Sequence, residues 1–231
     1  FTARTITTSA DGPRSVYAAD IDSDGDIDVL SATYFDNKIA WYENGLSAFG
    51  DPTFGSANIT TSADAAASVY AADIDNDGDL DVVSASYSDD KIAWYESDGA
   101  ADPSFTARTI TTSADGAYSV YAADVDNDGD MDVVSASVTD DKIAWYENDG
   151  AADPSFTDRT ITTSADGASD VYAADIDNDG DIDVVYASRN DDKIAWYEND
   201  GAADPSFTTR TISTSADFAF TVYAADIDND G

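Results

Sequence analysis

The sequence predicts an all-β protein, a β-propeller of four-stranded blades with a Ca²⁺ loop between strands A and B of each blade. Three observations lead to this prediction. The chain repeats about every 51 residues, each repeat holds four short strand-like segments, and each repeat has one loop rich in aspartate. An ordinary β-sandwich would not explain such a period. We therefore expect residues 1–231 to form a single repeat array.

The repeat is marked by the pattern Asp-x-Asp-x-Asp-Gly, whose five copies are separated by 53, 51, 51 and 51 residues. Residues 102–152 and 153–203 differ at only eight of 51 positions, so the chain is one supersecondary unit used repeatedly. The expected blades span approximately residues 16–61, 69–112, 120–163 and 171–214, with a D-type strand at 1–8 and a partial fifth blade at 222–231.

In the second repeat, turn residues separate four strand-like segments at 68–72, 81–86, 91–96 and 105–112, which we call strands A to D. Strand C is apolar on both faces, with Trp94 on one face and Tyr95 on the other. A sheet packed between two neighbouring sheets meets this requirement. We therefore expect inter-blade packing, rather than sugar stacking, for the four tryptophans, Trp41, Trp94, Trp145 and Trp196.

The loop between strands A and B reads Asp-x-Asp-x-Asp-Gly-Asp-x-Asp in all four complete copies. Carboxylates at loop positions 1, 3, 5 and 9 can converge on one ion, to which position 7 adds a backbone carbonyl, and the glycine at position 6 permits a sharp turn. Several carboxylates suit Ca²⁺, whereas Mg²⁺ keeps its waters and zinc favours nitrogen or sulfur. We expect one Ca²⁺ per complete loop, four in all, and a fifth if the chain continues. The candidate metal-binding residues are Asp20, Asp22, Asp24, Asp26, Asp28, Asp73, Asp75, Asp77, Asp79, Asp81, Asp124, Asp126, Asp128, Asp130, Asp132, Asp175, Asp177, Asp179, Asp181 and Asp183, with Asp226, Asp228 and Asp230 in the incomplete fifth copy.

The charge of the chain favours a bound cation over a merely solvated acidic turn. The formal net charge is −38, and like charges about 4 Å apart repel by roughly 1 kcal/mol in water and about 4 kcal/mol near a protein surface. With only ten Lys and Arg, the chain is not expected to bind nucleic acid, which requires clustered basic residues.

Other classes of function are excluded by what the composition lacks. The chain has no Cys and no His, so it has no thiolate ligands and lacks the commonest general base and transition-metal ligand. We therefore do not expect an enzyme. No apolar run approaches the roughly 20 residues that span a bilayer, so membrane insertion is not expected.

The loop, its strand flanks and the repeat length resemble the FG-GAP family, also called VCBS-type repeats, and are similar to integrin α-subunit propellers and to a group of fungal and bacterial lectins. The resemblance covers essentially the whole chain, although the Phe-Gly and Gly-Ala-Pro signatures of the family are not present as such. It implies that Asp20, Asp22, Asp24 and Asp28 are side-chain ligands and that Asp26 supplies its carbonyl, with the same pattern in the other loops. It also implies about seven blades, so another copy or further blades would close the ring.

The repeats differ from one another mainly before strand A and in the B–C turn. In a four-stranded meander these connections lie at one end, opposite the acidic loops. Loops on a rigid scaffold often carry function, and Tyr, Phe and Arg are common at interfaces. Relaxed drift in exposed loops is the alternative explanation. The candidate ligand rim consists of Arg14, Tyr34, Phe35, Tyr87, Tyr118, Arg189 and Phe220.

The sequence thus predicts a non-catalytic module at the cell surface or outside the cell, in which calcium stabilises the fold for adhesion or ligand recognition. Its expected partner is a carbohydrate or a surface protein. Two alternatives stay open, a multivalent carbohydrate-binding lectin and a structural spacer in a surface fibre or adhesin.

Overall fold

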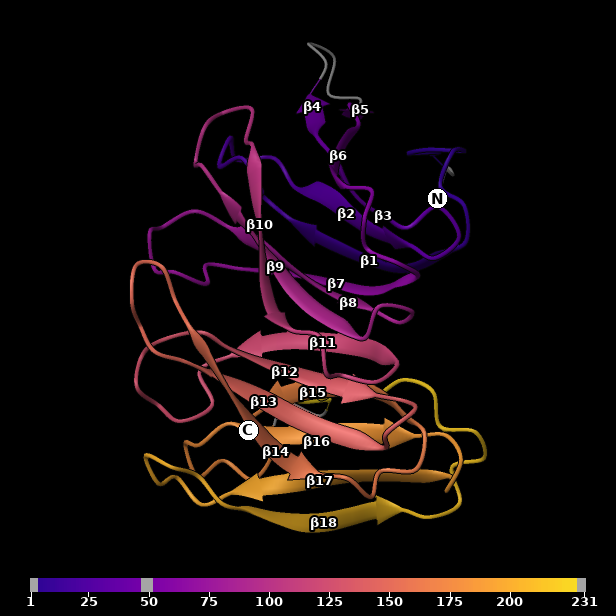
Figure 1. Cartoon of the computed structure of the whole chain (residues 1–231), viewed down its shortest axis with the longest axis vertical. Coiled ribbons are helices and arrows are strands. Elements are labelled where there is room, and N and C mark those ends of the chain that lie inside the picture. The colour runs from indigo at the N-terminus through magenta and orange to yellow at the C-terminus, as the bar shows by residue number, and fades with distance from the viewer. Residues whose placement is uncertain (1–3, 47–51, 228–231) are drawn as a thin grey trace.

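Four antiparallel four-stranded sheets follow one another along the chain and stack in chain order (Figure 1). The computed structural model describes residues 4–46 and 52–227. We call the sheets units 1 to 4. Unit 1 contains β1 (Pro13–Ala19), β2 (Asp28–Thr33), β3 (Lys38–Tyr42) and β6 (Ala57–Thr60), with a small hairpin of β4 (Asn44–Leu46) and β5 (Pro52–Phe54). Unit 2 contains β7 (Ala66–Ala72), β8 (Asp81–Ser86), β9 (Lys91–Ser97) and β10 (Phe105–Thr111). Unit 3 contains β11 (Ala117–Ala123), β12 (Asp132–Ser137), β13 (Lys142–Asn148) and β14 (Phe156–Thr162), and unit 4 contains β15 (Ala168–Ala174), β16 (Asp183–Ser188), β17 (Lys193–Asn199) and β18 (Phe207–Ser213).

Each unit is a simple meander in which every strand pairs with the next one along the chain. The first strand of each unit begins two to three residues earlier than the sequence indicates, because pairing continues past a β-bulge. In unit 2 the register steps from Ala66↔Ser86 to Ser68↔Ala85, which leaves Ala67 as the bulged residue. Units 1, 3 and 4 have the same register shift after their first residue.

The hydrophobic core lies between units rather than within them. Trp94 of unit 2 is 1% exposed and belongs to a buried cluster with Val120 and Val133 of unit 3. Equivalent clusters join unit 1 to unit 2 and unit 3 to unit 4. Inter-blade packing of Trp41, Trp94 and Trp145 is thus confirmed, because both faces of a central sheet are covered by its neighbours. Trp196 is half-buried on the outer face of unit 4.

The first strands of successive units lie side by side and line a common axis. Their tyrosines form a continuous ladder, with neighbouring ring centroids 4.4 to 4.7 Å apart, which runs through Tyr17, Tyr70, Tyr121, Tyr172 and Tyr223. The units therefore radiate from this ladder, and within the described residues they form an open arc (Figure 1).

The two ends of each unit carry different connections, as the meander predicts. At one end the turn after the second strand bonds to the connection that precedes the first strand, as in Tyr87 N to Ala65 O at 3.1 Å. At the other end the acidic loop contacts the end of the third strand, as in Ser97 N to Asp81 Oδ1 at 2.8 Å. We call the first the rim end and the second the acidic end.

Two expected strands are absent from the described residues. Residues 4–8 form no strand, and residues 222–226, the described start of the expected partial fifth blade, form none either. The sequence prediction is wrong here because a strand needs a hydrogen-bonded partner. Among the described residues, no strand pairs with either segment. Residues 1–3 and 228–231 lie outside the described part of the chain.

Candidate metal centres in the acidic loops

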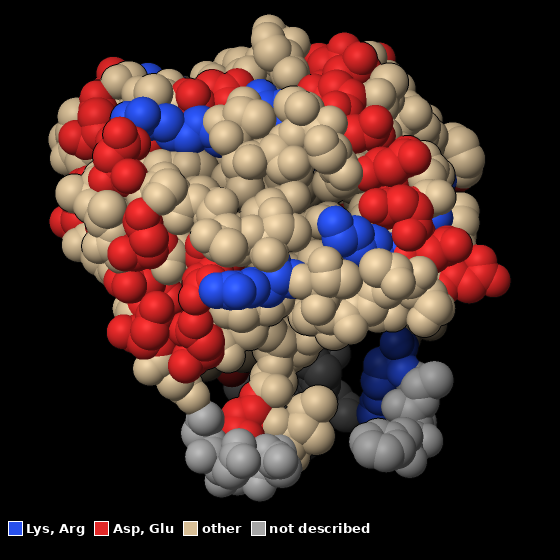
Figure 2. Space-filling view, turned by 90° about the horizontal axis from the view of Figure 1, so that it is seen from below, with Lys and Arg blue, Asp and Glu red and all other residues tan. Residues whose placement is uncertain are grey.

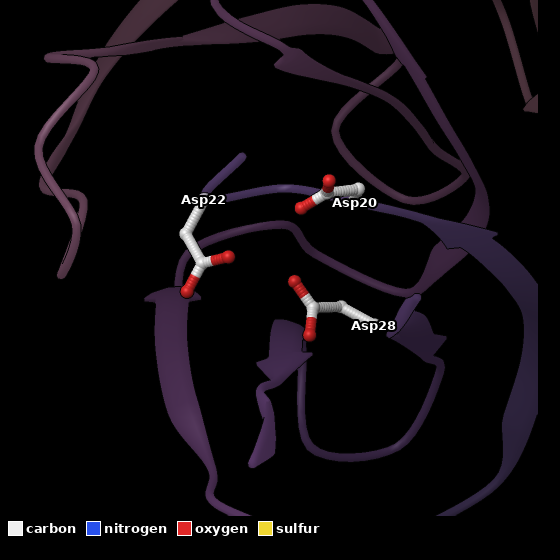
Figure 3. Close-up of side chains that lie close together, drawn as sticks. All are labelled: Asp20, Asp22 and Asp28. Carbon is white, nitrogen blue, oxygen red and sulfur yellow. The ribbon is translucent and has the colours of Figure 1, made fainter. Parts of the chain in front are cut away.

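Each complete acidic loop brings three carboxylates together. The aspartates at loop positions 1, 3 and 9 each offer one oxygen, and in every loop these oxygens lie within 4.8 Å of one another. Figure 3 shows the first loop, where the three side chains point toward a common space. The four triads are Asp20–Asp22–Asp28, Asp73–Asp75–Asp81, Asp124–Asp126–Asp132 and Asp175–Asp177–Asp183.

The ninth-position aspartate is the buried anchor of each triad. It is the first residue of the second strand, so its position is fixed by the sheet, and Asp132 is 0% exposed. Its two oxygens accept backbone hydrogen bonds, Oδ1 from Asn148 N at 2.8 Å and Oδ2 from Val125 N at 2.9 Å. The same pair of bonds holds Asp28, Asp81 and Asp183.

Burial makes the negative charge of these anchors unfavourable in the absence of a cation. Desolvation raises the pKa of Asp81 to about 7, that of Asp132 to about 8 and that of Asp183 to about 6, although the backbone N–H groups act in the opposite direction. Desolvation also raises the pKa of the third-position aspartates, and their acidic neighbours add to the shift. A divalent cation would remove this cost by pairing with the ionised carboxylates.

The loop backbone is shaped around the first aspartate. Asp73 accepts two backbone hydrogen bonds, from Asp77 N to Oδ1 at 3.1 Å and from Gly78 N to Oδ2 at 3.0 Å. Gly78 has φ of +98°, a conformation that side chains rarely adopt, while Asn76 at loop position 4 is left-handed with φ of +59°. The glycine turn expected at position 6 is therefore present, and it wraps the loop around the triad.

The carboxylates at positions 5 and 7 have other partners. The fifth-position Asp77 is not a member of its triad, and its Oδ1 accepts a hydrogen bond from Asp79 N at 2.9 Å. The seventh-position side chain bonds to the neighbouring loop instead, since Asn76 Nδ2 donates to Asp130 Oδ1 at 2.6 Å and Asn127 Nδ2 donates to Asp181 Oδ1 at 2.7 Å. Adjacent acidic loops are thus linked directly, a contact that sequence reasoning missed. The only signal for it was a recurrent Asn at position 4.

The donor set fits a hard, oxygen-preferring cation. Each triad offers carboxylate oxygens only, and one of its members is buried with no basic side chain among its bonded partners. Calcium accepts such all-oxygen sites and tolerates irregular geometry. Of the fifth loop, Asp226 lies within the described residues, whereas Asp228 and Asp230 do not.

The structure also gathers the residues of the candidate ligand rim. Five aromatic rings from units 1 to 3 and from the segment after unit 4 form a chain of contacts at the rim end, with centroids 5.4 to 6.3 Å apart. Two guanidinium groups lie over these rings, Arg14 over Tyr34 at 4.8 Å and Arg189 over Tyr118 at 5.7 Å. Phe218, which the sequence did not single out, extends the group by stacking on Phe220. The contacting rings are Phe35, Tyr34, Tyr87, Tyr118 and Phe220.

Comparison with known proteins places the repeats in a family. The model of the FG-GAP-like repeat matches this chain four times, over residues 20–84, 73–135, 124–186 and 175–231. No curated protein matches the chain.

Solved structures resemble this chain at low sequence identity, and one of them has a TM-score above 0.5, which indicates a similar fold. A Bacteroides uniformis protein, provisionally assigned as a 6-phosphogluconolactonase, is 16% identical with a TM-score of 0.53 and is matched over 85% of this chain and 55% of its own. Rhamnogalacturonan lyase YesW, at 14% identity and a TM-score of 0.48, is matched over 93% of this chain and 41% of its own. The V. cholerae biofilm matrix protein Bap1, at 17% identity and a TM-score of 0.40, is matched over 92% and 41%. The chain thus spans about half the length of these proteins or less.

Proposed function

Because this chain belongs to the FG-GAP-like repeat family, we propose that its complete acidic loops bind Ca²⁺ and that the ions stabilise a non-catalytic β-propeller module for adhesion or ligand recognition. The observation that carries the proposal is the repeated triad, in which a buried aspartate held by two backbone N–H groups meets two further carboxylates. Four such sites neutralised by calcium would change the formal charge by +8, from −38 to −30.

The position of the sites explains how calcium would act on the whole module. Each loop joins the innermost strand of a unit to the next strand, and the Asn–Asp hydrogen bonds connect loops of adjacent units. An ion that orders one loop therefore also orders the interface with its neighbour. We propose a location outside the cell or on its surface, where calcium is concentrated enough to fill sites with the affinities of about 10⁻⁴–10⁻³ M that extracellular calcium modules have.

Further blades or another copy of the chain would complete the propeller. The outer face of unit 4 supports this part of the proposal, because the middle of the face carries few charges (Figure 2). Ile212 on this face is 60% exposed, whereas its counterparts Ile110 and Ile161 pack against the following unit. Among the described residues, no helix could cross a membrane.

Calorimetric titration of chelator-treated protein tests the proposal directly. We expect Ca²⁺ to bind with a stoichiometry of one per complete loop and to raise the melting temperature. Mg²⁺ at equal concentration should do so much less, because it gives up its waters reluctantly. Identical melting in calcium and in chelator would refute the stabilising role.

A further inference from the structure

A cavity of about 250 Å³ lies on the axis at the rim end, opposite the acidic loops. It is lined by the same repeat position from all five copies of the repeat. This position lies two residues before the valine of the Val-Tyr-Ala-Ala-Asp segment in each copy. The five residues are Arg14, Ala67, Tyr118, Ser169 and Phe220.

The β-bulges of the first strands direct this position toward the cavity. In units 1 to 4 the lining residue is the one that the register skips, as Tyr118 is between Ala117↔Ser137 and Ser119↔Ala136. A bulge bends its strand and changes the direction of the side chain it carries. The fold therefore presents the bulged residue of every repeat to a single space, together with the residue that follows it.

This position differs among repeats that are otherwise nearly the same. The five residues that begin two positions later, Val-Tyr-Ala-Ala-Asp, are identical in all five copies, whereas the cavity position holds five different residue types. Its side chain does not set the strand pairing, because the bulged residue lies outside the ladder. The differences thus shape the cavity while leaving the scaffold unchanged.

The floor of the cavity is polar and is held by hydrogen bonds between units. The residue after each bulge accepts a hydrogen bond from the next unit, as in Val69 N to Ser15 Oγ at 3.4 Å and Val120 N to Ser68 Oγ at 3.3 Å. In unit 4 the residue after the bulge is Asp170, whose Oδ2 accepts a hydrogen bond from Val222 N at 2.9 Å. These bonds occupy N–H groups on the inner strand edges, so an extended peptide cannot use them for strand addition.

The walls combine aromatic faces with hydrogen-bond donors. Tyr118 and Phe220 meet edge to face with centroids 5.7 Å apart, and Arg14 Nη1 donates to the Tyr118 hydroxyl at 3.1 Å. A pyranose ring matches such walls, because its C–H face packs on an aromatic ring while its hydroxyls bond to serine, tyrosine and guanidinium groups. The volume lies just below the about 300–1,000 Å³ of typical small-molecule pockets, which suits one sugar ring.

We propose that this axial cavity binds a single pyranose unit of a carbohydrate. The inference deepens the proposed function and rests on it only in requiring the calcium-loaded fold. Each repeat contributes the bulged residue and the residue after it, so the chain forms one composite site rather than several equivalent ones.

Saturation-transfer NMR on the full chain in calcium tests the proposal. The probes are glucose, galactose, mannose, fucose, N-acetylglucosamine and glucuronate, each at about 10 mM. We expect at least one of them to bind and expect Tyr118→Ser and Arg14→Ala each to weaken it about tenfold or more. Both variants should fold, because the same repeat position already carries Ser169 and Ala67.

Two control variants separate the cavity from the rest of the surface. Asp158→Ala copies Ala107 at the same position of the preceding repeat, changes a strand residue that does not line the cavity, and should leave binding within about twofold. Arg210→Ala removes a positive charge from the outer strand β18 and should also have little effect. No binding by the whole panel to protein with a native melting transition would overturn the cavity proposal, as would equal losses in Asp158→Ala and Tyr118→Ser. Binding of a control tripeptide in place of every sugar would overturn it as well. Calcium dependence of melting is measured separately, so failure of either proposal is recognised independently.

Discussion

Asp132→Asn tests the calcium linkage most sharply, because the substitution removes one charge from a fully buried anchor and leaves its shape unchanged. If free calcium is a hundredfold above Kd, each site stabilises the fold by about 2.7 kcal/mol, so four sites contribute about 11 kcal/mol. This equals the whole stability of many domains, about 5–15 kcal/mol. Loss of one site should therefore be large and measurable.

The substitution also has a cost that does not depend on calcium. Both Asp132 oxygens accept hydrogen bonds from backbone N–H groups. The asparagine amide has only one oxygen that can accept, so its NH₂ group faces the second N–H. A buried donor left without an acceptor costs about 1–3 kcal/mol. The informative quantity is therefore the difference between calcium and chelator, compared between the variant and the parent protein.

Urea unfolding at neutral pH, with saturating calcium and with chelator, gives the four free energies of unfolding. We expect calcium to stabilise the parent by about 2.7 kcal/mol more than Asp132→Asn. Asp102→Asn is the matched control, because it removes the same charge from an exposed hairpin residue, and its calcium increment should equal that of the parent. An equal increment in the parent and in Asp132→Asn would refute the reasoning that this residue is a calcium ligand.

Four further outcomes follow from the same structure. The pKa of Asp132 is raised to about 8 by burial, so calcium-free protein should lose stability as pH rises from about 5 to about 8. Calcium affinity should increase over the same range, because protons compete with the ion for the carboxylate. Thermal melts and calcium titrations at both pH values check these two expectations. Gly129→Ala should cost about 1–3 kcal/mol through strain alone, because φ is +99° and no atom lies within 4 Å of the added Cβ; unchanged stability would contradict it. Asn127→Ala removes the bond to Asp181 and should lower the Hill coefficient of calcium binding while the number of sites stays constant. Trp94→Ala should destabilise the protein by about 3–5 kcal/mol, since the side chain is 1% exposed between units, and denaturant unfolding measures it.

The repeat period and strand chemistry made most of the architecture predictable from the sequence. Strand C, apolar on both faces, required a covered sheet, and Trp94 is indeed buried between two units. The acidic pattern made a cation site predictable because five aspartates in nine residues repel one another unless they are paired. Which of those carboxylates meet could not be read from spacing alone, since every second residue of the loop is acidic.

The sequence by itself determined the repeating unit, its four strands, the position of each acidic loop and the end of the unit that varies. Local patterns decide these features, because strand periodicity and turn residues act over a few neighbours. Only the tertiary structure decided that positions 1, 3 and 9 form the triad, that Asn76 reaches Asp130 of the next loop, and that Arg14, Tyr118 and Phe220 share one cavity. The last two of these contacts join residues about 50 to 200 positions apart, and they depend on how side chains pack across each interface between units.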